Sequence, residues 1–220
     1  MEIQDFRRNY DQASLQFSNL EPNPTAEFLK WLELAHATPA PHWLEITAMT
    51  LATSDSSGRV SARIVLLKTV DVTGFTFFTN YRSDKAQQLL ANPYAALVFY
   101  WPHMERQVRV EGLVSFTDSD VSDEYFHARP RGSQIGAVVS PQSQPLQDRD
   151  QLEASAAELA ETYAGQQIIP RPEYWGGYLL KPHRVEFWQG RPNRLHDRFL
   201  YSKTESDEQP ESWKVSRLAP

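Results

Sequence analysis

The sequence predicts an α+β fold that is mainly β, with a β-sheet at its centre and helices packed around it. Stretches rich in β-branched and aromatic residues follow one another closely in the first half of the chain, separated by short turns. This succession indicates an antiparallel meander, which a barrel would close. Segments with helical spacing flank the meander. The 220 residues, 40% hydrophobic and 12% aromatic, suit a globular protein with a sizeable core.

A first helix is expected over about residues 24–37. Asn23 is a typical N-cap, and Pro24 suits the first helical position. Residues 1–20 show no clear period. We therefore interpret 1–20 as a flexible N-terminal segment and 21–220 as a single domain.

Strands dominate the next part of the chain. Turn sequences rich in Asp, Ser and Gly separate the first stretches. A short helix is expected to begin near Ser83 and to stop at Asn92-Pro93. The predicted strands lie at 46–53, 59–70, 75–80, 94–101 and 106–116.

The pattern becomes helical after residue 117 and returns to strands near residue 175. Helical character is expected over 118–130 and 133–140 and in a longer helix over about 148–164, whose apolar residues follow a 4, 3, 4 spacing. The last predicted strands are 176–180, 184–190, 198–203 and 213–218.

The composition excludes several functional classes. The chain has no Cys, which removes disulfides, thiolate zinc sites, iron–sulfur clusters and Cys nucleophiles. His-x-His and His-Glu-x-x-His spacings are also absent, so no metal is expected. The 22 Lys and Arg against 28 Asp and Glu give a net charge of −6, which argues against general nucleic-acid or membrane binding.

The expected location is the cytoplasm. The polar start lacks the apolar core of a signal peptide. The longest apolar run, 94–101, is about eight residues, well short of the roughly 20 that span a bilayer.

Basic residues lie on or beside apolar strands and at the start of the short helix. Lys85 falls in the first helical turn, where a cation opposes the helix dipole. That position is favourable if an anion such as a phosphate binds at the helix N-terminus. Solvated surface cations would explain the same spacing.

Two further segments carry polar side chains in strand-like order. Alternation over 106–112 puts Gln107, Arg109 and Glu111 on one face, which lines a polar cavity or faces water. Near the end of the chain, Arg194 and His196 share a side if the backbone is extended. Bringing such cationic groups together is costly unless an anion or an electron-rich ring neutralises their charge. The alternative is a polar loop whose side chains already have hydrogen-bond partners.

Several long motifs follow one another along the chain. They are RIVLLK (63–68), GFTFFTNYRSDKA (74–86), NPYAALVFYW (92–101), RQVRVEG (106–112), YFHARPRGSQIGAVVSPQS (125–143), WGGY (175–178), EFWQGRPNRLHDR (186–198) and RLAP (217–220). Taken together, these motifs resemble the pyridoxamine 5′-phosphate oxidase family of flavoenzymes. The resemblance runs from about residue 24 to residue 220, with a looser match at Arg7–Tyr10.

The resemblance implies an FMN-binding split β-barrel homodimer with two FMN sites across the subunit interface. It assigns the FMN phosphate to Arg63 and Lys85, and it brings Trp188 and Arg198 from the other subunit. The full set it assigns to FMN is Arg63, Ile64, Val65, Leu66, Leu67, Lys68, Phe78, Thr79, Lys85, Gln107, Gln142, Ser143, Trp188 and Arg198.

The resemblance also implies a substrate site. Arg194 and His196 would lie against the pyridine ring and its 3-oxygen as the catalytic residues. The substrate phosphate would be held by two cations and two hydroxyl groups, a set that suits a dianion. The residues assigned to substrate are Lys68, Tyr125, Arg129, Ser133, Arg194, His196, Arg7 and Tyr10.

One position departs from the family pattern. The family usually has Arg-Lys where this chain has Asp84-Lys85. Because a carboxylate repels phosphate at close range, we expect weaker FMN retention than in relatives, unless Arg82 substitutes for the missing cation.

The implied reaction oxidises the 4′ carbon of pyridoxine or pyridoxamine 5′-phosphate to pyridoxal 5′-phosphate, in vitamin B6 biosynthesis and salvage. A hydride passes to the flavin, which dioxygen reoxidises to give hydrogen peroxide, and the amine substrate releases ammonia. The partners are therefore phosphorylated B6 vitamers, dioxygen and a second subunit. The alternatives are a related FMN oxidase of the phenazine-biosynthesis type and a non-catalytic flavin- or pyridoxal-phosphate-binding protein.

Overall fold

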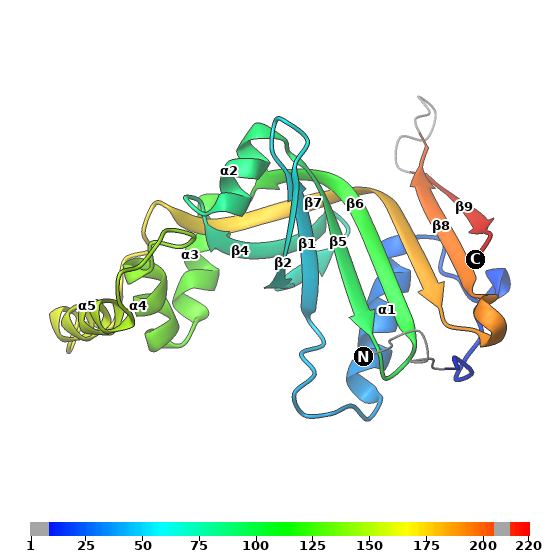
Figure 1. Cartoon of the computed structure of the whole chain (residues 1–220), viewed down its shortest axis with the longest axis horizontal. Helices are drawn as coiled ribbons and strands as arrows, with labels where there is room; N and C mark the ends of the chain where they lie inside the picture. The colour runs from blue at the N-terminus through cyan, green and yellow to red at the C-terminus, as the bar shows by residue number, and fades with distance from the viewer. Residues whose placement is uncertain (1–8, 205–211) are drawn as a thin grey trace, which may run out of the picture.

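A curled antiparallel sheet forms the centre of the computed structural model, which describes residues 9–204 and 212–220 (Figure 1). Within these residues the sheet has nine strands in the order β2-β1-β5-β6-β7-β4-β3, and β8 and β9 continue from β7. The strands are β1 (Ala48–Ser54), β2 (Val60–Leu66), β3 (Thr69–Asp71), β4 (Gly74–Asn80), β5 (Tyr94–Trp101), β6 (Arg106–Phe116), β7 (Trp175–Gln189), β8 (Asp197–Lys203) and β9 (Trp213–Leu218). The predicted fold, α+β and mainly β, is confirmed.

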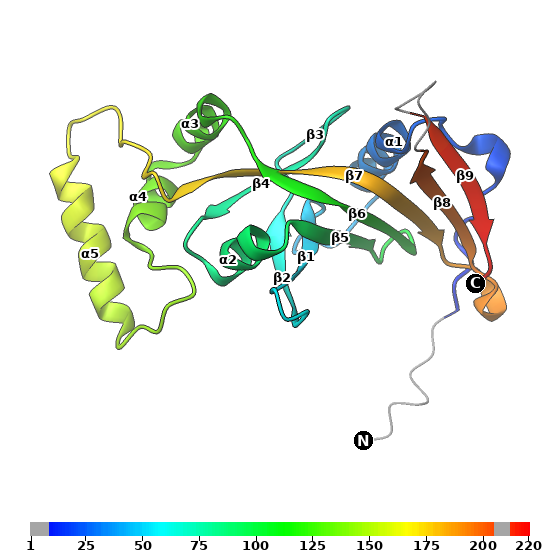
Figure 2. The same cartoon turned by 90° about the horizontal axis from the view of Figure 1, so that it is seen from above.

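One helix packs on a face of the sheet, and three others form a helical region at one end of the molecule. α1 (Pro24–Ala37) packs its aromatic side chains on the sheet: the ring centroid of Phe28 lies 4.9 Å from that of Phe75 in β4 and 4.7 Å from that of Phe99 in β5. Figures 1 and 2 show α3, α4 and α5 at one end of the long axis and β8 and β9 at the other. The helices are α1 (Pro24–Ala37), α2 (Asp84–Ala91), α3 (Ser119–Ala128), α4 (Arg131–Val139) and α5 (Arg149–Thr162), with 3-10 turns at Phe17–Asn19 and Pro192–Arg194.

Two apolar cores follow from this arrangement. The larger lies between the sheet and α1 and includes Trp31, Leu51 and Phe187. The smaller lies under α3, α4 and α5, around Phe126 and Trp175. No helix in the described part of the chain is long and apolar enough to cross a lipid bilayer.

The single strand predicted over 59–70 is wrong, because the chain changes partner there. β2 pairs with β1 as far as Leu66, and β3 pairs with β4 from Thr69. Between them, the Lys68 N–H already donates to the carbonyl of Thr76, 2.9 Å away.

The two strands predicted at 176–180 and 184–190 are one continuous strand, β7. Pro182 separates them in the sequence, and Pro usually interrupts a central strand. Here Pro182 pairs with Gly112 where the β6–β7 register shifts. Gly112 is required at this bulge, because a Cβ would lie 2.3 Å from the Lys181 carbonyl oxygen.

Candidate functional site

The predicted FMN residue Arg63 lies in β2 with its side chain directed toward α2. Its Nη1 donates to the Leu51 carbonyl at 3.1 Å and to Thr53 Oγ1 at 2.6 Å. Its Nη2 donates to Gln88 Oε1 in α2 at 3.2 Å. The guanidinium is therefore fixed between the sheet and the helix.

Lys85 in the first turn of α2 is buried, with 8% of its surface exposed. Its Nζ donates to Gln142 Oε1 at 2.8 Å and to Thr79 Oγ1 at 3.1 Å. Burial, together with the nearby Arg63 charge, lowers the pKa of Lys85 to about 8, although the Asp84 carboxylate opposes both effects. Among the described residues no carboxylate makes an ion pair with Lys85.

The loop after α4 closes this arrangement. Ser143 has a left-handed backbone, with φ 71°, and its Oγ accepts the Asp84 N–H at 3.2 Å. We call Arg63, Thr79, Lys85, Gln142 and Ser143 the donor cluster. Cations, hydroxyl groups and a helix N-terminus in one place are the chemistry that binds a phosphate.

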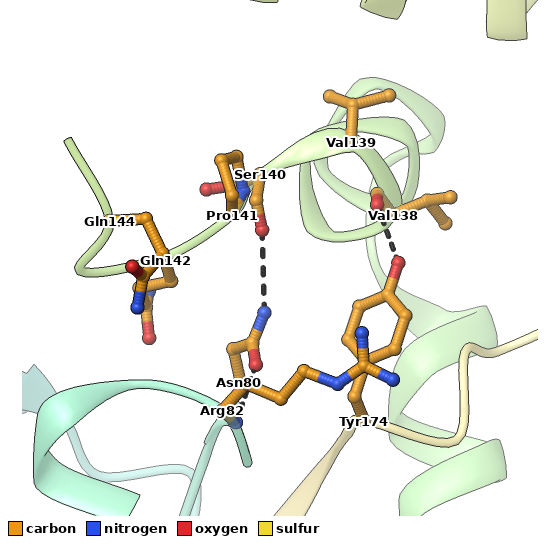
Figure 3. Close-up of a pocket in the computed structure, with 9 residues that line it drawn as sticks. All are labelled: Asn80, Arg82, Val138, Val139, Ser140, Pro141, Gln142, Gln144 and Tyr174. Carbon is orange, nitrogen blue, oxygen red and sulfur yellow. Dashed lines mark hydrogen bonds between the residues drawn. The ribbon is translucent and has the colours of Figure 1, made fainter. Parts of the chain in front are cut away.

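Arg82 points toward Tyr174 and away from Gln142 of the donor cluster, as Figure 3 shows. Its guanidinium lies 4.5 Å from the centroid of the Tyr174 ring. Both residues line a cavity of about 370 Å³, and Gln142 lies on the opposite wall. The position of Arg82 therefore does not support a role in replacing the cation missing at Asp84.

A second cavity, of about 260 Å³, contains two of the predicted substrate residues, Arg129 and Ser133. It shares Gln142 with the donor cluster. Arg129 Nη1 is buried and has no hydrogen-bond partner among the described residues. Burial also lowers the pKa of Arg129. An unpaired buried guanidinium N–H is costly unless an anion binds it, so the cavity is suited to an anionic group.

Stacked aromatic rings lie beside this cavity. The Phe78 and Tyr125 rings are stacked with 4.1 Å between centroids. Trp175 stacks on Phe78 at 5.6 Å, and the Arg129 guanidinium lies 4.7 Å from the Trp175 ring. Three predicted residues, Phe78, Tyr125 and Arg129, are thus brought together by β4, β7 and α3.

Lys68 and the β2 residues predicted to line the flavin are arranged differently. Lys68 is exposed beyond the end of β2 and is not part of the cavity that contains Arg129. Ile64 and Leu66 are exposed on the outer face of β2, while Val65 and Leu67 pack toward the core.

Three residues far apart in the sequence form one row across β6, β7 and β8. Gln107 pairs with Trp188, and Trp188 pairs with Arg198. We call Gln107, Trp188 and Arg198 the C-terminal row. Alternation along β6 was predicted correctly, because Val108 and Val110 are buried on the opposite face.

His196 lies beside this row. Its ring is 4.6 Å from Trp188 and 5.7 Å from Tyr10, centroid to centroid. The backbone N–H of Arg191 donates to His196 Nδ1 at 3.1 Å. Burial lowers the pKa of His196, and the charges of Arg194 and Arg198 lower it further.

Arg194 is not on an extended strand, contrary to the arrangement considered from the sequence. It ends the 3-10 turn Pro192–Arg194 with φ 63° after Asn193 with φ 56°. Its side chain is exposed. Arg7, the other predicted cation of this group, lies outside the described residues.

Two family models match the chain. One, described as "Pyridoxamine 5'-phosphate oxidase", matches residues 40–163, and the other, described as "Pyridoxine 5'-phosphate oxidase C-terminal dimerisation region", matches residues 175–220. The chain belongs to the pyridoxamine 5′-phosphate oxidase family. The resemblance found in the sequence is thereby confirmed, and the second match implies a homodimer.

Relatives in this family match the chain over almost its whole length. Proteins named pyridoxine/pyridoxamine 5′-phosphate oxidase are 51% identical in Paraburkholderia phytofirmans and 50% identical in Ralstonia nicotianae, each over 99% of both chains.

Solved structures support the split-barrel fold. PhzG from Burkholderia lata, in complex with tetrahydrophenazine-1-carboxylic acid, is 29% identical, with a TM-score of 0.85 over 95% of this chain and 100% of that chain. A pyridoxamine 5′-phosphate oxidase-related, FMN-binding protein from Nostoc punctiforme is 19% identical, with a TM-score of 0.70 over 91% of this chain and 100% of that chain.

In this oxidase family member, one protomer keeps the Arg129 cavity and the C-terminal row far apart. β7 begins at Trp175 beside the cavity and reaches the row at Trp188. An extended strand rises about 3.3 Å per residue, so these ends are on the order of 40 Å apart. Figures 1 and 2 agree, with α3 and α4 at one end and β8 at the other.

Sequence reasoning missed residues that hold predicted ones in place. Gln88 anchors Arg63, and Glu186 accepts a hydrogen bond from Arg198 Nε at 2.7 Å. Gln88 follows Lys85 by three positions on one helix, which is a spacing that could have indicated a shared face. Glu186 is at a buried strand position, where the alternation pattern alone gives no sign of a carboxylate partner.

Proposed function

We propose that this chain is an FMN-dependent oxidase that converts pyridoxamine and pyridoxine 5′-phosphate to pyridoxal 5′-phosphate with dioxygen as acceptor. The observation that carries the proposal is a pair of adjacent anion-receptive groups, the donor cluster and the Arg129 cavity, which share Gln142. Two neighbouring phosphate-bearing ligands account for both groups.

The donor cluster fits the phosphate of FMN. Lys85 is buried without an ion-pair partner among the described residues, while Arg63 and the hydroxyl group of Ser143 lie around it. The Lys85 ammonium already donates to three neutral oxygens, so an anion would supply the negative charge that the cluster lacks and offset the cost of burying an ammonium group. When bound, FMN supplies the two-electron acceptor, which dioxygen regenerates with release of hydrogen peroxide.

The Arg129 cavity fits the phosphate of the substrate. Arg129 Nη1 is the buried donor without a partner, and Ser133 adds a hydroxyl group to the lining. Charge-assisted hydrogen bonds from both groups would favour phosphorylated over unphosphorylated vitamers.

His196 is arranged to hold a proton on one defined nitrogen. Since its Nδ1 accepts the Arg191 N–H, the neutral ring carries its proton on Nε2. The lowered pKa keeps the ring neutral near physiological pH. Its Nε2–H would donate to the 3-oxygen of the substrate, and the Arg194 charge would stabilise negative charge on the ring.

The C-terminal row would act on the site of the other subunit. Within one chain it is too distant from the donor cluster for one cofactor to touch both. A homodimer that places the row of one chain beside the donor cluster of the other resolves this separation.

The proposal is tested by measuring hydrogen peroxide with four substrates, the two 5′-phosphates and their unphosphorylated forms. We expect turnover of the phosphorylated compounds only, because the proposed contacts of Arg129 and Ser133 are with the phosphate group of the substrate. Equal activity with the unphosphorylated forms would overturn the assignment of Arg129 to the substrate phosphate.

A second candidate is oxidation of a reduced phenazine carboxylate, which the similarity to PhzG supports. A fifth assay arm with such a compound separates the two. Turnover of the phenazine without turnover of either 5′-phosphate favours this candidate. A preparation that binds FMN and consumes no dioxygen with any of them favours a non-catalytic binding role.

Arg194 provides a test of the proposed catalytic role. Arg194→Ala should lower kcat by about a hundredfold or more while FMN content stays near that of the wild type, because the side chain acts on the substrate. Parallel losses of kcat and FMN content would instead mark Arg194 as a structural residue.

A further inference from the structure

A ladder of alternating charges crosses β8, β7 and β6 beside the C-terminal row. Arg198 Nε donates to Glu186 Oε1 at 2.7 Å, and Glu186 Oε2 lies 3.5 Å from Arg109 Nη2. The same Arg109 nitrogen donates to Glu111 Oε1 at 2.8 Å. Glu186 is the buried member, with 3% of its surface exposed.

Arg198 is held at two points. Besides the bond to Glu186, its Nη1 donates to the carbonyl of Ala219 at 2.8 Å. These two acceptors fix the plane of the guanidinium. Among the described residues Nη2 makes no hydrogen bond and Nη1 makes one, so three of the five N–H groups of Arg198 remain for a ligand.

A buried carboxylate is costly unless it has a specific partner. Glu186 has such a partner, because Arg198 Nε donates a hydrogen bond to its Oε1. In the described part of the chain, Glu186 Oε2 accepts no hydrogen bond. An apolar side chain would suit the strand better if stability were its only role. The burial therefore indicates that the carboxylate serves to orient Arg198.

We propose that Glu186 is a positioning residue that, together with the Ala219 carbonyl, orients Arg198 toward the FMN site of the other subunit. This inference rests on the proposed function, because it takes Arg198 as a contact of FMN. Glu186 itself touches neither cofactor nor substrate. It acts by fixing which N–H groups Arg198 presents across the interface.

The test compares Glu186→Gln with Glu111→Gln in the full-length dimer. Both changes remove one carboxylate of the same ladder, but Glu111 makes no contact with Arg198. The readout is the dissociation constant of FMN from fluorescence titration of protein stripped of flavin, with the dimer checked by sedimentation velocity. We expect about tenfold weaker binding for Glu186→Gln, equal to about 1.4 kcal/mol, and a change within about twofold for Glu111→Gln.

A double-mutant cycle separates positioning from a general structural effect. If Glu186 acts through Arg198, Glu186→Gln adds almost nothing once Arg198 is replaced by Ala. Glu186→Asp, which keeps the charge and shortens its reach, should weaken FMN binding to an intermediate degree, and it serves as the second variant if Glu186→Gln fails to fold.

The outcomes are distinct. An unchanged FMN dissociation constant in Glu186→Gln, or a full additional loss in the Arg198→Ala background, overturns the positioning role while the proposed function stands. A wild-type protein that binds no FMN overturns the proposed function itself.

Discussion

Two adjacent charged residues at the start of α2 set the electrostatics of the donor cluster. Lys85 is buried against Thr79 and Gln142, while Asp84 is exposed. The Asp84 carboxylate acts on both Arg63 and Lys85, raising the pKa of each against the stronger effect of burial. The affinity for a phosphate at this place therefore depends on the protonation of one residue and on the negative charge of the other.

FMN affinity should fall as the pH rises above about 8. Below that pH Lys85 is an ammonium, and a bound phosphate would raise its pKa, because a nearby negative charge favours the charged form. Between the pKa values of the free and bound states, binding takes up a proton, so the dissociation constant rises toward about tenfold per pH unit. FMN titrations from about pH 7 to about pH 9 measure this slope. Lys85→Arg, which stays charged, should flatten it, and a flat wild-type profile would contradict the expectation.

Removing the charge of Asp84 should tighten FMN binding. Asp84→Asn is expected to lower the dissociation constant by about three- to tenfold at low salt, because a repulsion of about 1 kcal/mol is lost. The gain should shrink as salt screens it. Arg82→Ala is the comparison variant and should change FMN binding by less than about twofold, since its guanidinium stacks on Tyr174. A larger loss in Arg82→Ala than gain in Asp84→Asn would restore the idea that Arg82 replaces the missing cation.

At the scale of elements, local signals predicted most boundaries, and long-range pairing decided the rest. The Asn23 cap accepts from the Thr25 N–H at 2.8 Å, and the helix runs over Pro24–Ala37 as expected. The predicted break at Pro182 failed because its bulge partner, Gly112, lies on another strand. No local pattern reveals such a partner.

The candidate site shows the same division. Short motifs predicted Arg63, Lys85 and Gln142 as site residues through resemblance, and the fold brings Lys85 into contact with Gln142 and within the electrostatic influence of Arg63. The anchoring of Arg63 by Gln88 and of Arg198 by Glu186 depends on contacts between elements. Those contacts become visible only when the strands are in register.

β7 also carries a test of packing at its start. A Cβ on Gly177 would lie 2.5 Å from Thr117 Oγ1 and 2.8 Å from Phe78 Cε1. Gly177→Ala should therefore lower the free energy of unfolding by about 1–3 kcal/mol, and it should also disturb the Phe78–Tyr125 stack. Denaturant unfolding measures the change. Gly132→Ala in α4 is the control: nothing lies within 4 Å of its Cβ, so the free energy should stay equal or rise by up to about 1 kcal/mol. Equal stability in both variants would contradict the packing argument.

At the scale of the whole molecule, the proposed function requires a second subunit. β7 connects the Arg129 cavity at one end to Trp188 at the other, and its length separates them within one chain. Under the proposed function, a symmetric dimer that brings opposite ends together would produce two equivalent composite sites. Each site would then take the donor cluster from one chain and the C-terminal row from its partner.

Composite sites predict complementation between two inactive variants. Arg129→Ala disables the cavity end of a chain, and Arg194→Ala disables the C-terminal end. In a heterodimer of the two, one site receives both changes and the other receives neither. Coexpression with two different tags allows the heterodimer to be purified, and it should recover about half of the wild-type kcat per dimer with nearly normal KM, because one of its two sites is intact. Each homodimer should stay inactive, which serves as the matched control. If each site were built within one chain, every site of the heterodimer would carry one change, and no activity would return.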